Sequence, residues 1–166
     1  AWDAIVELTG RKVSEDFRSG SFISKPEKVD IRPGELQTGI LIPKQSYQGY
    51  QGHYIKYAMR NAMDIATLGC SANVKLSEDK TVIEDVRIAY GVAGPIPMRA
   101  VHAEEAGRGK EVSARILEEI AEQVLFDIHP RDSWRASKAF REHIARVLCQ
   151  RALKEAIVRT GGVIHE

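Results

Sequence analysis

"ATLGCSANVKL", residues 66–76, alternates apolar and polar side chains with the period of a β-strand. After a four-residue turn, SEDK, "VIEDVRIAYGV" at residues 82–92 repeats the alternation, with Glu84 as the one break in its apolar face. Two such segments joined by a short turn predict an antiparallel pair, and residues 98–105 are predicted to return as a third, shorter strand. The dry face would carry Ala66, Leu68, Cys70, Ala72, Val74 and Leu76, then Val82, Val86, Ile88, Tyr90 and Val92.

Helical patterns follow these strands and supply a cover for the dry face. Ser113 can cap a first helix that Pro130 ends. A second, longer helix is predicted from Asp132 or Ser133 to about Arg159, before two glycines. Because each strand has one dry and one wet face, the helices should all lie on one side of the sheet. The expected fold class is α+β: an antiparallel sheet of about three strands covered on one face by helices, an α+β sandwich.

The first part of the chain has a different character. Strands are predicted at residues 4–8 and at about 36–42, with a turn at 9–12 and an irregular Gly-, Pro- and Ser-rich connection at 19–35. The chain opens on Ala1 directly before a strand, so we expect a piece of a larger protein. The predicted organisation is terminal strands of a preceding domain at 1–45, a linker at 46–53, and a separate domain at 54–166.

Composition narrows the function classes. The 166 residues are 43% hydrophobic, and 24 basic residues nearly cancel 23 acidic ones, for a net charge of +1. Such a chain can bury a core, and its charge does not predict a nucleic-acid partner. No stretch is apolar enough to predict a membrane span. Only two cysteines are present, far apart in sequence, which favours a reducing, cytoplasmic setting without a disulfide framework.

The common catalytic and phosphate-binding motifs are missing from the sequence. The five histidines have no metal-ligand spacing, and no glycine-rich phosphate loop occurs. Cys70 falls on the predicted dry face, where a buried, unreactive thiol is expected. We therefore predict no catalytic residue and no metal site within this chain.

"KYAMRNAMD", residues 56–64, is the one stretch that suggests a site. In a helix, Lys56, Arg60 and Asp64 would stack at i, i+4 and i+8, and in a strand they would share one face. Either geometry gathers two cations and an anion on one surface. Spacing alone leaves two readings open: Asp64 forms a short-range pair or cap, or the three residues border a ligand.

Three longer segments carry a resemblance: "YIKYAMRNAMDIATLGCSANV" (54–74), "RIAYGVAGPIPMRAVHAEE" (87–105) and "DIHPRDSWRASKAFREHIARVLCQRAL" (127–153). In this order they resemble the C-terminal domain of the FAD-binding subunits of molybdenum hydroxylases, the family of xanthine dehydrogenase and carbon monoxide dehydrogenase. The resemblance covers about residues 53–160. It implies that residues 1–45 close the preceding FAD-binding domain.

The resemblance also implies a place in electron transfer. A purine such as xanthine would be hydroxylated at a molybdopterin centre on one partner subunit, and iron–sulfur clusters on another would pass electrons to FAD, with NAD as acceptor. Lys56 becomes a candidate flavin neighbour, with Arg60 and Asp64 as further candidates. Reduced flavin gathers negative charge, so a nearby cation would favour reduction and a carboxylate would oppose it. Met63 stands where some relatives carry an acidic residue, so a charge switch is not expected.

Two hypotheses about function therefore stand side by side. In the first, the domain walls off a flavin that is held mainly by the preceding domain, and this chain alone is inactive and colourless. In the second, it is a non-catalytic subunit-assembly module with no flavin contact.

Overall fold

The computed structural model describes residues 1–10, 14–18 and 22–166. It divides into two compact units, Trp2–Gln48 and Gly49–Glu166, the second of which also includes Ala1. The strands pair antiparallel in every described sheet. Within these residues, the first unit contains two sheets and the second unit contains one.

The first unit contains a three-stranded sheet in the order β2-β1-β5 and a two-stranded ribbon, β3-β4. The predicted strands at 4–8 and 36–42 are confirmed as β1 and β5, whereas the connection predicted to be irregular contains strands of its own. The turn predicted at 9–12 extends into residues that lie outside the described ranges. The elements are β1 (Ile5–Thr9), β2 (Ser14–Arg18), β3 (Ile23–Lys25), β4 (Lys28–Val29), β5 (Leu36–Leu41) and the one-turn helix α2 (Lys44–Tyr47).

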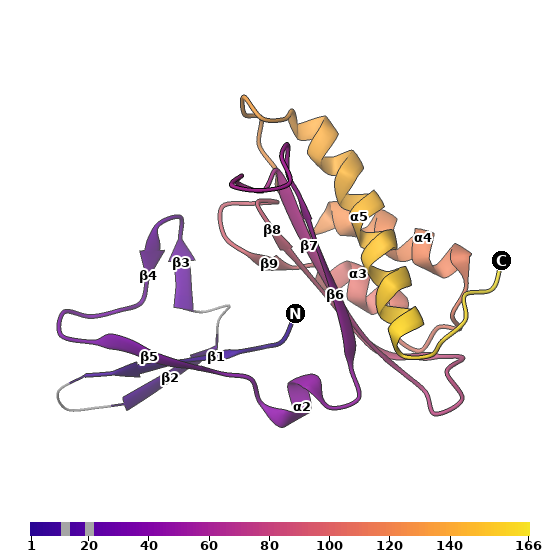
Figure 1. Cartoon of the computed structure of the whole chain (residues 1–166), viewed down its shortest axis with the longest axis horizontal. Coiled ribbons are helices and arrows are strands. Elements are labelled where there is room, and N and C mark those ends of the chain that lie inside the picture. Colours follow the sequence, from indigo (N-terminus) through magenta and orange to yellow (C-terminus); the bar gives the residue numbers. More distant parts are fainter. Residues whose placement is uncertain (11–13, 19–21) are drawn as a thin grey trace. The chain divides into compact units, whose positions relative to one another are not determined.

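The second unit is a four-stranded antiparallel sheet with its helices on one face (Figure 1). This confirms the α+β class, but the sheet has one strand more than expected, because residues 51–57 form an edge strand. Its strands, in the order β6-β7-β8-β9, are β6 (Gln51–Tyr57), β7 (Leu68–Leu76), β8 (Ile83–Gly91) and β9 (Met98–Arg99). Its helices are α3 (Val101–Gly107), α4 (Ala114–Gln123), the 3-10 turn η1 (Val124–Phe126) and α5 (Lys138–Arg159).

The central hairpin β7–β8 follows the predicted alternation except near its ends. Val92, predicted on the dry face, lies beyond the end of β8 at Gly91, has a left-handed backbone (φ 64°) and is 41% exposed. The register shifts between Lys75 and Leu76, so that Leu76 pairs with Ile83. This irregularity puts Ile83, rather than the predicted Val82, on the dry face, where it is fully buried. It also explains Glu84, which lies on the exposed side and pairs with Lys75 at 2.9 Å.

The core of this unit lies between the sheet and the helices. Ile88 and Tyr90 of β8 are buried against apolar side chains of α4 and α5, such as Ile120 and Leu153. Each fully buried side chain of this kind contributes roughly 1.5–3 kcal/mol relative to an exposed one. The Tyr90 hydroxyl donates a hydrogen bond of 2.8 Å to the carbonyl of Ala145, which fastens α5 to the sheet.

The predicted start is confirmed for α4 but not for α5. Ser113 caps α4 as predicted, and its Oγ accepts from the Ile116 N–H. However, α5 begins at Lys138 with Ser137 as its cap, because Ser133 and Ala136 bond to each other across a tight turn. The predicted third strand is wrong beyond Arg99, since the chain turns there into α3.

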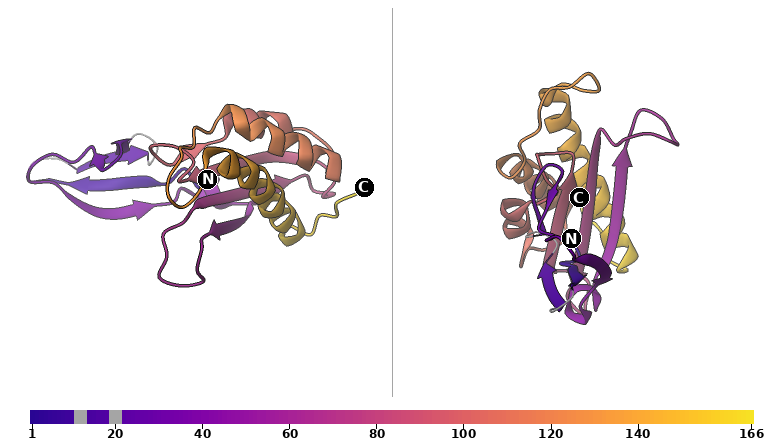
Figure 2. Two further views of the ribbon diagram at one scale, coloured as in Figure 1. Left: turned by 90° about the horizontal axis from the view of Figure 1, so that it is seen from above. Right: turned by 90° about the vertical axis from the view of Figure 1, so that its left-hand side faces the viewer.

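Two connections lie at the same end of the second sheet, one from β6 to β7 and one leading into α5 (Figures 1 and 2). The rings of Tyr57, the last residue of β6, and Phe140, in the first turn of α5, lie 6.0 Å apart. This end of the unit therefore presents two loops, and it contains the residues predicted to form a site.

Candidate functional site

Lys56 lies on the face of the sheet that carries no helix. In the β6–β7 register, Lys56 pairs with Gly69 and Tyr54 pairs with Ser71. Gly69 and Ser71 belong to the wet face of β7, so the Lys56 and Tyr54 side chains share that face. Lys56 is exposed, and β6 ends at Tyr57, so neither the helical nor the fully extended interpretation holds for all of residues 56–64.

The β6–β7 loop nevertheless brings the three predicted residues together. The Lys56 ammonium donates a hydrogen bond of 2.6 Å to the carbonyl oxygen of Asp64. The Asp64 carboxylate accepts from the backbone N–H of Arg60 at 3.0 Å, and the Arg60 guanidinium donates to the carbonyl of Met63 at 2.7 Å. Each side chain thus holds the loop backbone, and Asp64 bonds to the Arg60 backbone rather than to its guanidinium.

The electrostatics of the loop keep Asp64 ionised. Desolvation acts to raise the pKa of Asp64, but backbone hydrogen bonds from Arg60, Ile65 and Met59 outweigh it and lower the pKa. The loop therefore holds two cations and one anion at neutral pH. Met63 adopts a left-handed backbone conformation (φ 51°) and is 94% exposed, so the loop turns its apolar side chains outward.

Tyr54 is a feature of this surface that the sequence reasoning missed. Its ring lies over Gly69, where a Cβ would come within 2.8 Å of the Tyr54 hydroxyl. The tyrosine is still 59% exposed, so the outer side of the ring is open. Tyr54 and Lys56 are two residues apart, so in a strand they lie on the same face. The sequence would have indicated this surface only if residues 51–57 had been predicted as a strand. The result is an aromatic side chain and a cation on one open face.

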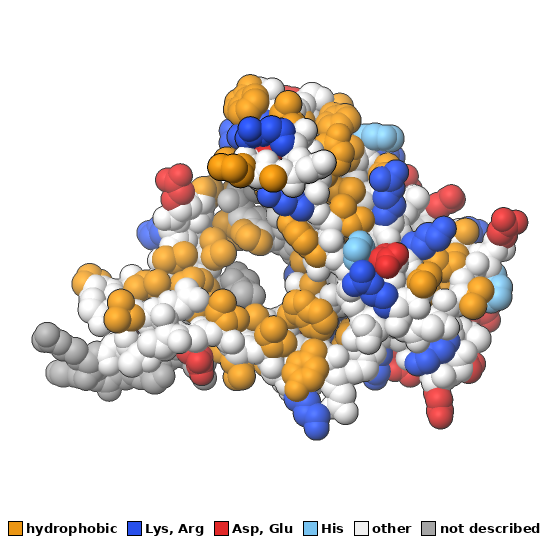
Figure 3. Space-filling view, viewed as in Figure 1, with side chains coloured by type: hydrophobic (Ala, Val, Ile, Leu, Met, Phe, Trp, Pro, Cys, Tyr) orange, Lys and Arg blue, Asp and Glu red, His pale blue; other side chains and the backbone are white. Residues whose placement is uncertain are grey.

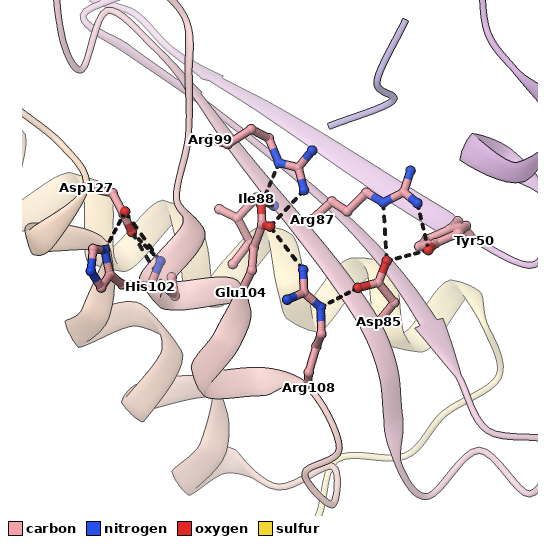
Figure 4. Close-up of polar contacts among 10 residues, drawn as sticks. Tyr50, Asp85, Arg87, Ile88, Arg99, His102, Glu104, Arg108 and Asp127 are labelled. Carbon is pink, nitrogen blue, oxygen red and sulfur yellow. Dashed lines mark hydrogen bonds and ion pairs between the residues drawn. The ribbon is translucent and has the colours of Figure 1, made fainter. Parts of the chain in front are cut away.

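A second polar cluster, at the other edge of the sheet, was also missed (Figure 4). Glu104 of α3 is 2% exposed, and its carboxylate accepts from the backbone N–H of Ile88 at 2.9 Å. It also accepts from Arg99 at 2.6 and 2.7 Å and from Arg108 at 3.3 Å. Because β9 is only two residues long, Glu104 completes the edge of β8 where no strand pairs with it.

The cluster continues to the first residues of the second unit (Figure 4). Arg108 donates to Asp85 at 2.6 Å, and the other oxygen of Asp85 accepts from the Tyr50 hydroxyl. Arg87 donates to Asp85 at 3.2 Å and lies over the Tyr50 ring, 4.4 Å from its centroid. Burial, followed by the hydrogen bond to Asp85, raises the pKa of Tyr50 to about 12. This cluster binds structural elements together and leaves no open reacting group.

His102 and Asp127 form a further pair, which joins α3 to η1. The Asp127 carboxylate accepts from the His102 backbone N–H at 3.1 Å, and its other oxygen lies 2.8 Å from the His102 Nδ1. The pKa of His102 is raised by this hydrogen bond and by the Asp127 charge. Asp127 supplies the N-terminal cap that α3 lacks in its own sequence, where Ala100 occupies the cap position.

The remaining candidate groups are structural. Cys70 is fully buried as predicted, and burial raises the pKa of its thiol to about 12. Within the described residues, no group of His, Cys, Asp and Glu side chains could hold a metal ion. No helix among them is long and apolar enough to cross a membrane.

Solved structures share this fold. Carbon monoxide dehydrogenase from Hydrogenophaga pseudoflava matches with a TM-score of 0.87 over 96% of this chain and 54% of the matched chain, at 23% identity. Quinoline 2-oxidoreductase from Pseudomonas putida 86 matches with a TM-score of 0.84, at 19% identity. These matches show that the chain shares the fold of this part of both proteins.

Sequence comparison identifies the family. Residues 53–156 match the CO dehydrogenase flavoprotein C-terminal domain, and the chain belongs to this family. It is 36% identical over 99% of its length to the xanthine dehydrogenase FAD-binding subunit of Escherichia coli O157:H7, and 31% identical over 93% to the glyceraldehyde dehydrogenase medium chain of Sulfolobus acidocaldarius. The chain spans 56% and 53% of these relatives, about half of their length.

Proposed function

We propose that this chain is the C-terminal part of the FAD-binding subunit of a xanthine dehydrogenase-type molybdenum hydroxylase. Its second unit walls off the flavin, which passes electrons from iron–sulfur clusters to NAD in the cytoplasm. The FAD is held mainly by a preceding domain, and the molybdopterin and the iron–sulfur clusters belong to partner subunits. The 36% identity to a xanthine dehydrogenase FAD-binding subunit is the observation that carries this proposal.

The open face around Lys56 fits contact with a flavin ring. Tyr54 offers the outer side of a half-exposed aromatic ring, and the Lys56 ammonium lies two residues further along the same strand. A planar ring can stack on the tyrosine while the cation favours the negative charge that develops on reduction. Bound flavin supplies the redox chemistry, and the role of these residues is to orient the ring, exclude water and set the local charge.

Arg60 and Asp64 enter the proposal as residues that position Lys56. The Asp64 carbonyl oxygen fixes the Lys56 ammonium at 2.6 Å, and Arg60 holds the loop in the shape that presents this carbonyl. An ammonium has three donors, so the bond to Asp64 leaves Lys56 able to donate to a ligand as well.

One observation favours the second candidate, an assembly module without flavin contact. All three predicted site residues make hydrogen bonds within the loop, so each has a structural role that needs no ligand. In this case the exposed Met59 and Met63 side chains, 63% and 94% exposed, would serve subunit association alone.

Flavin fluorescence in the full-length FAD subunit separates the two candidates. A stacked tyrosine quenches flavin emission, so Tyr54→Leu is expected to raise the fluorescence of the bound flavin severalfold while partner subunits still co-purify. Tyr57→Leu is the matched control, because Tyr57 comes from the same strand but pairs with Leu68 on the dry face and contacts Phe140. Unchanged fluorescence together with loss of the partner subunits would support the assembly module instead.

A further inference from the structure

The segment that leads into α5 contains a cluster of basic and aromatic side chains that the proposed flavin contact does not use. We name it the arginine corner and define it by Arg131, Trp134, Arg135 and Arg141. It lies at the end of the second unit where Figure 3 shows hydrophobic and basic side chains interspersed around the top of the molecule.

Trp134 is an unusually exposed aromatic residue. It is 78% exposed, and the Arg135 guanidinium stacks on its ring at 4.1 Å from the centroid. Phe140, in the first turn of α5, is 40% exposed as well. Tryptophan and arginine are the residues that most often dominate the binding energy of protein interfaces. The stacked Trp134–Arg135 pair therefore has the composition of an interface anchor.

The turn that carries Trp134 is held rigidly by hydrogen bonds. Ser133 and Ala136 exchange backbone hydrogen bonds of 3.0 and 3.2 Å, which closes the turn around Trp134. The Ser133 hydroxyl oxygen accepts from the Arg135 N–H at 3.3 Å and from the Arg141 guanidinium at 2.7 Å. A surface that is already ordered loses little conformational entropy on binding, so this turn is preorganised to receive a partner.

The arginine corner has an excess of positive charge. Within the part of the chain that the structure describes, neither Arg131, Arg135 nor Arg141 forms an ion pair, and the Nε atoms of Arg135 and Arg141 are buried without a hydrogen-bond partner. Arg141 is 3% exposed, and burial followed by the charges of Arg131 and Arg135 lowers its pKa against the opposing effect of the Asp132 charge. Burying a cation without a counter-ion costs free energy, and a nearby negative charge lowers that cost.

The acidic side chains near the corner offset this charge only in part, because the effect of the Asp132 charge on Arg141 is outweighed by burial and by the neighbouring arginines. Asp132 accepts the backbone N–H of Lys138 at 2.7 Å, so its carboxylate caps the start of α5. Glu142 pairs with Lys138 at 3.6 Å. Glu142 is thus paired with Lys138, and the single charge of Asp132 does not balance the three arginines.

From these observations we propose that the arginine corner is a docking surface for an acidic segment of a partner polypeptide, with Trp134 as the apolar anchor, Arg131 and Arg135 as the carboxylate receivers, and the buried Arg141 as a positive charge beneath them. The inference rests on the proposed place of this chain in a multi-subunit enzyme. Charge complementarity identifies the partner chemistry: aspartate or glutamate side chains flanking an apolar residue that covers the indole ring.

Photo-crosslinking in the assembled enzyme tests the proposal. The photoreactive amino acid p-benzoyl-phenylalanine replaces Trp134 in the full-length FAD subunit, which is produced together with its partner subunits. The expected product is a crosslink to a partner-subunit peptide with an aspartate or glutamate within a few residues. A crosslink to a peptide without acidic residues, a crosslink to nucleic acid, or no intermolecular crosslink would overturn the proposal.

Two variants give an independent measurement of the same surface. Trp134→Ala and Arg135→Glu are expected to weaken subunit association at least tenfold, and the loss in Arg135→Glu should shrink as salt is added. Arg115→Glu and Phe126→Ala are matched controls on another part of the surface, where the Arg115 and Phe126 side chains are 78% and 67% exposed. Circular dichroism confirms that each variant is folded.

Equal association of the wild type and both corner variants would contradict the docking surface. Flavin fluorescence in the same samples separates this result from failure of the proposed function. The corner variants should leave the emission unchanged, whereas Tyr54→Leu should change it whether or not the corner binds a partner.

Discussion

The Glu104 side chain stabilises the edge of the sheet at β8 and β9. It completes the β8 edge at Ile88 and serves as counter-ion to Arg99 and Arg108. The residue pattern did not indicate this role, because residues 98–105 were predicted to form a third strand, whereas Glu104 lies in α3. Its function depends on where α3 packs, which is a tertiary property.

Glu104→Gln tests this role. The amide keeps the volume of the side chain but removes the charge that Arg99 and Arg108 face, so we expect a loss of about 2–3 kcal/mol in the free energy of unfolding. This is below the usual cost for a fully buried pair because the arginines are 28% and 42% exposed. Urea denaturation measures it. Glu119→Gln on α4, which removes an exposed pair with Arg115, should cost less than about 0.5 kcal/mol.

His102 provides a pH-dependent prediction. Its pKa in the folded protein is raised by Asp127, so the pair contributes its stabilisation fully below the ordinary histidine pKa of about 6.5 and loses it as pH rises through the raised value. The difference in unfolding midpoint between wild type and His102→Gln should therefore shrink with rising pH. An NMR titration should also show the His102 pKa falling in Asp127→Asn. A midpoint difference that grows with pH would contradict this assignment.

At the scale of elements, the correct predictions concern features that depend on residues close together in the sequence. The alternation in β7 and β8 and the Ser113 cap of α4 were correct because strand period and capping depend on neighbouring residues. The start of α5 was placed too early because Ser133 resembles a cap but takes part in a turn. The candidate residues Lys56, Arg60 and Asp64 do meet, but through a loop whose shape includes a left-handed Met63, which spacing rules do not predict.

Close packing of α3 is tested by Gly107→Ala. An added Cβ would lie 2.8 Å from Ile120 Cδ1 and 3.1 Å from Val86 Cγ1, and both side chains are fully buried. Overpacking costs about 1–3 kcal/mol, which exceeds the gain of about 1 kcal/mol from replacing a helical glycine. We expect a net loss of about 1 kcal/mol by urea denaturation. Gly91→Ala, where nothing lies within 4 Å of the new Cβ, should leave stability unchanged or slightly higher; equal losses in both variants would argue against this packing.

At the scale of the whole molecule, the two units suggest a domain boundary near Gln48 and Gly49. We propose that residues 49–166 fold alone, since the large buried cluster around β7, β8 and α5 lies entirely within them. The expected result for this segment is a single cooperative unfolding transition with a free energy of about 5–15 kcal/mol. A broad, non-cooperative transition, with loss of near-UV circular dichroism under native conditions, would contradict an independent domain.

The central proposal is that this domain borders the flavin, and the flavin reduction potential of the full-length subunit tests it most directly. Lys56→Met removes the cation and should lower the potential by about 30 mV, which corresponds to about 1.4 kcal/mol for two electrons. Lys75→Met, at the opposite end of the same sheet face and paired with Glu84, should leave the potential unchanged. Equal potentials in the wild type and both variants would contradict a flavin neighbour at Lys56.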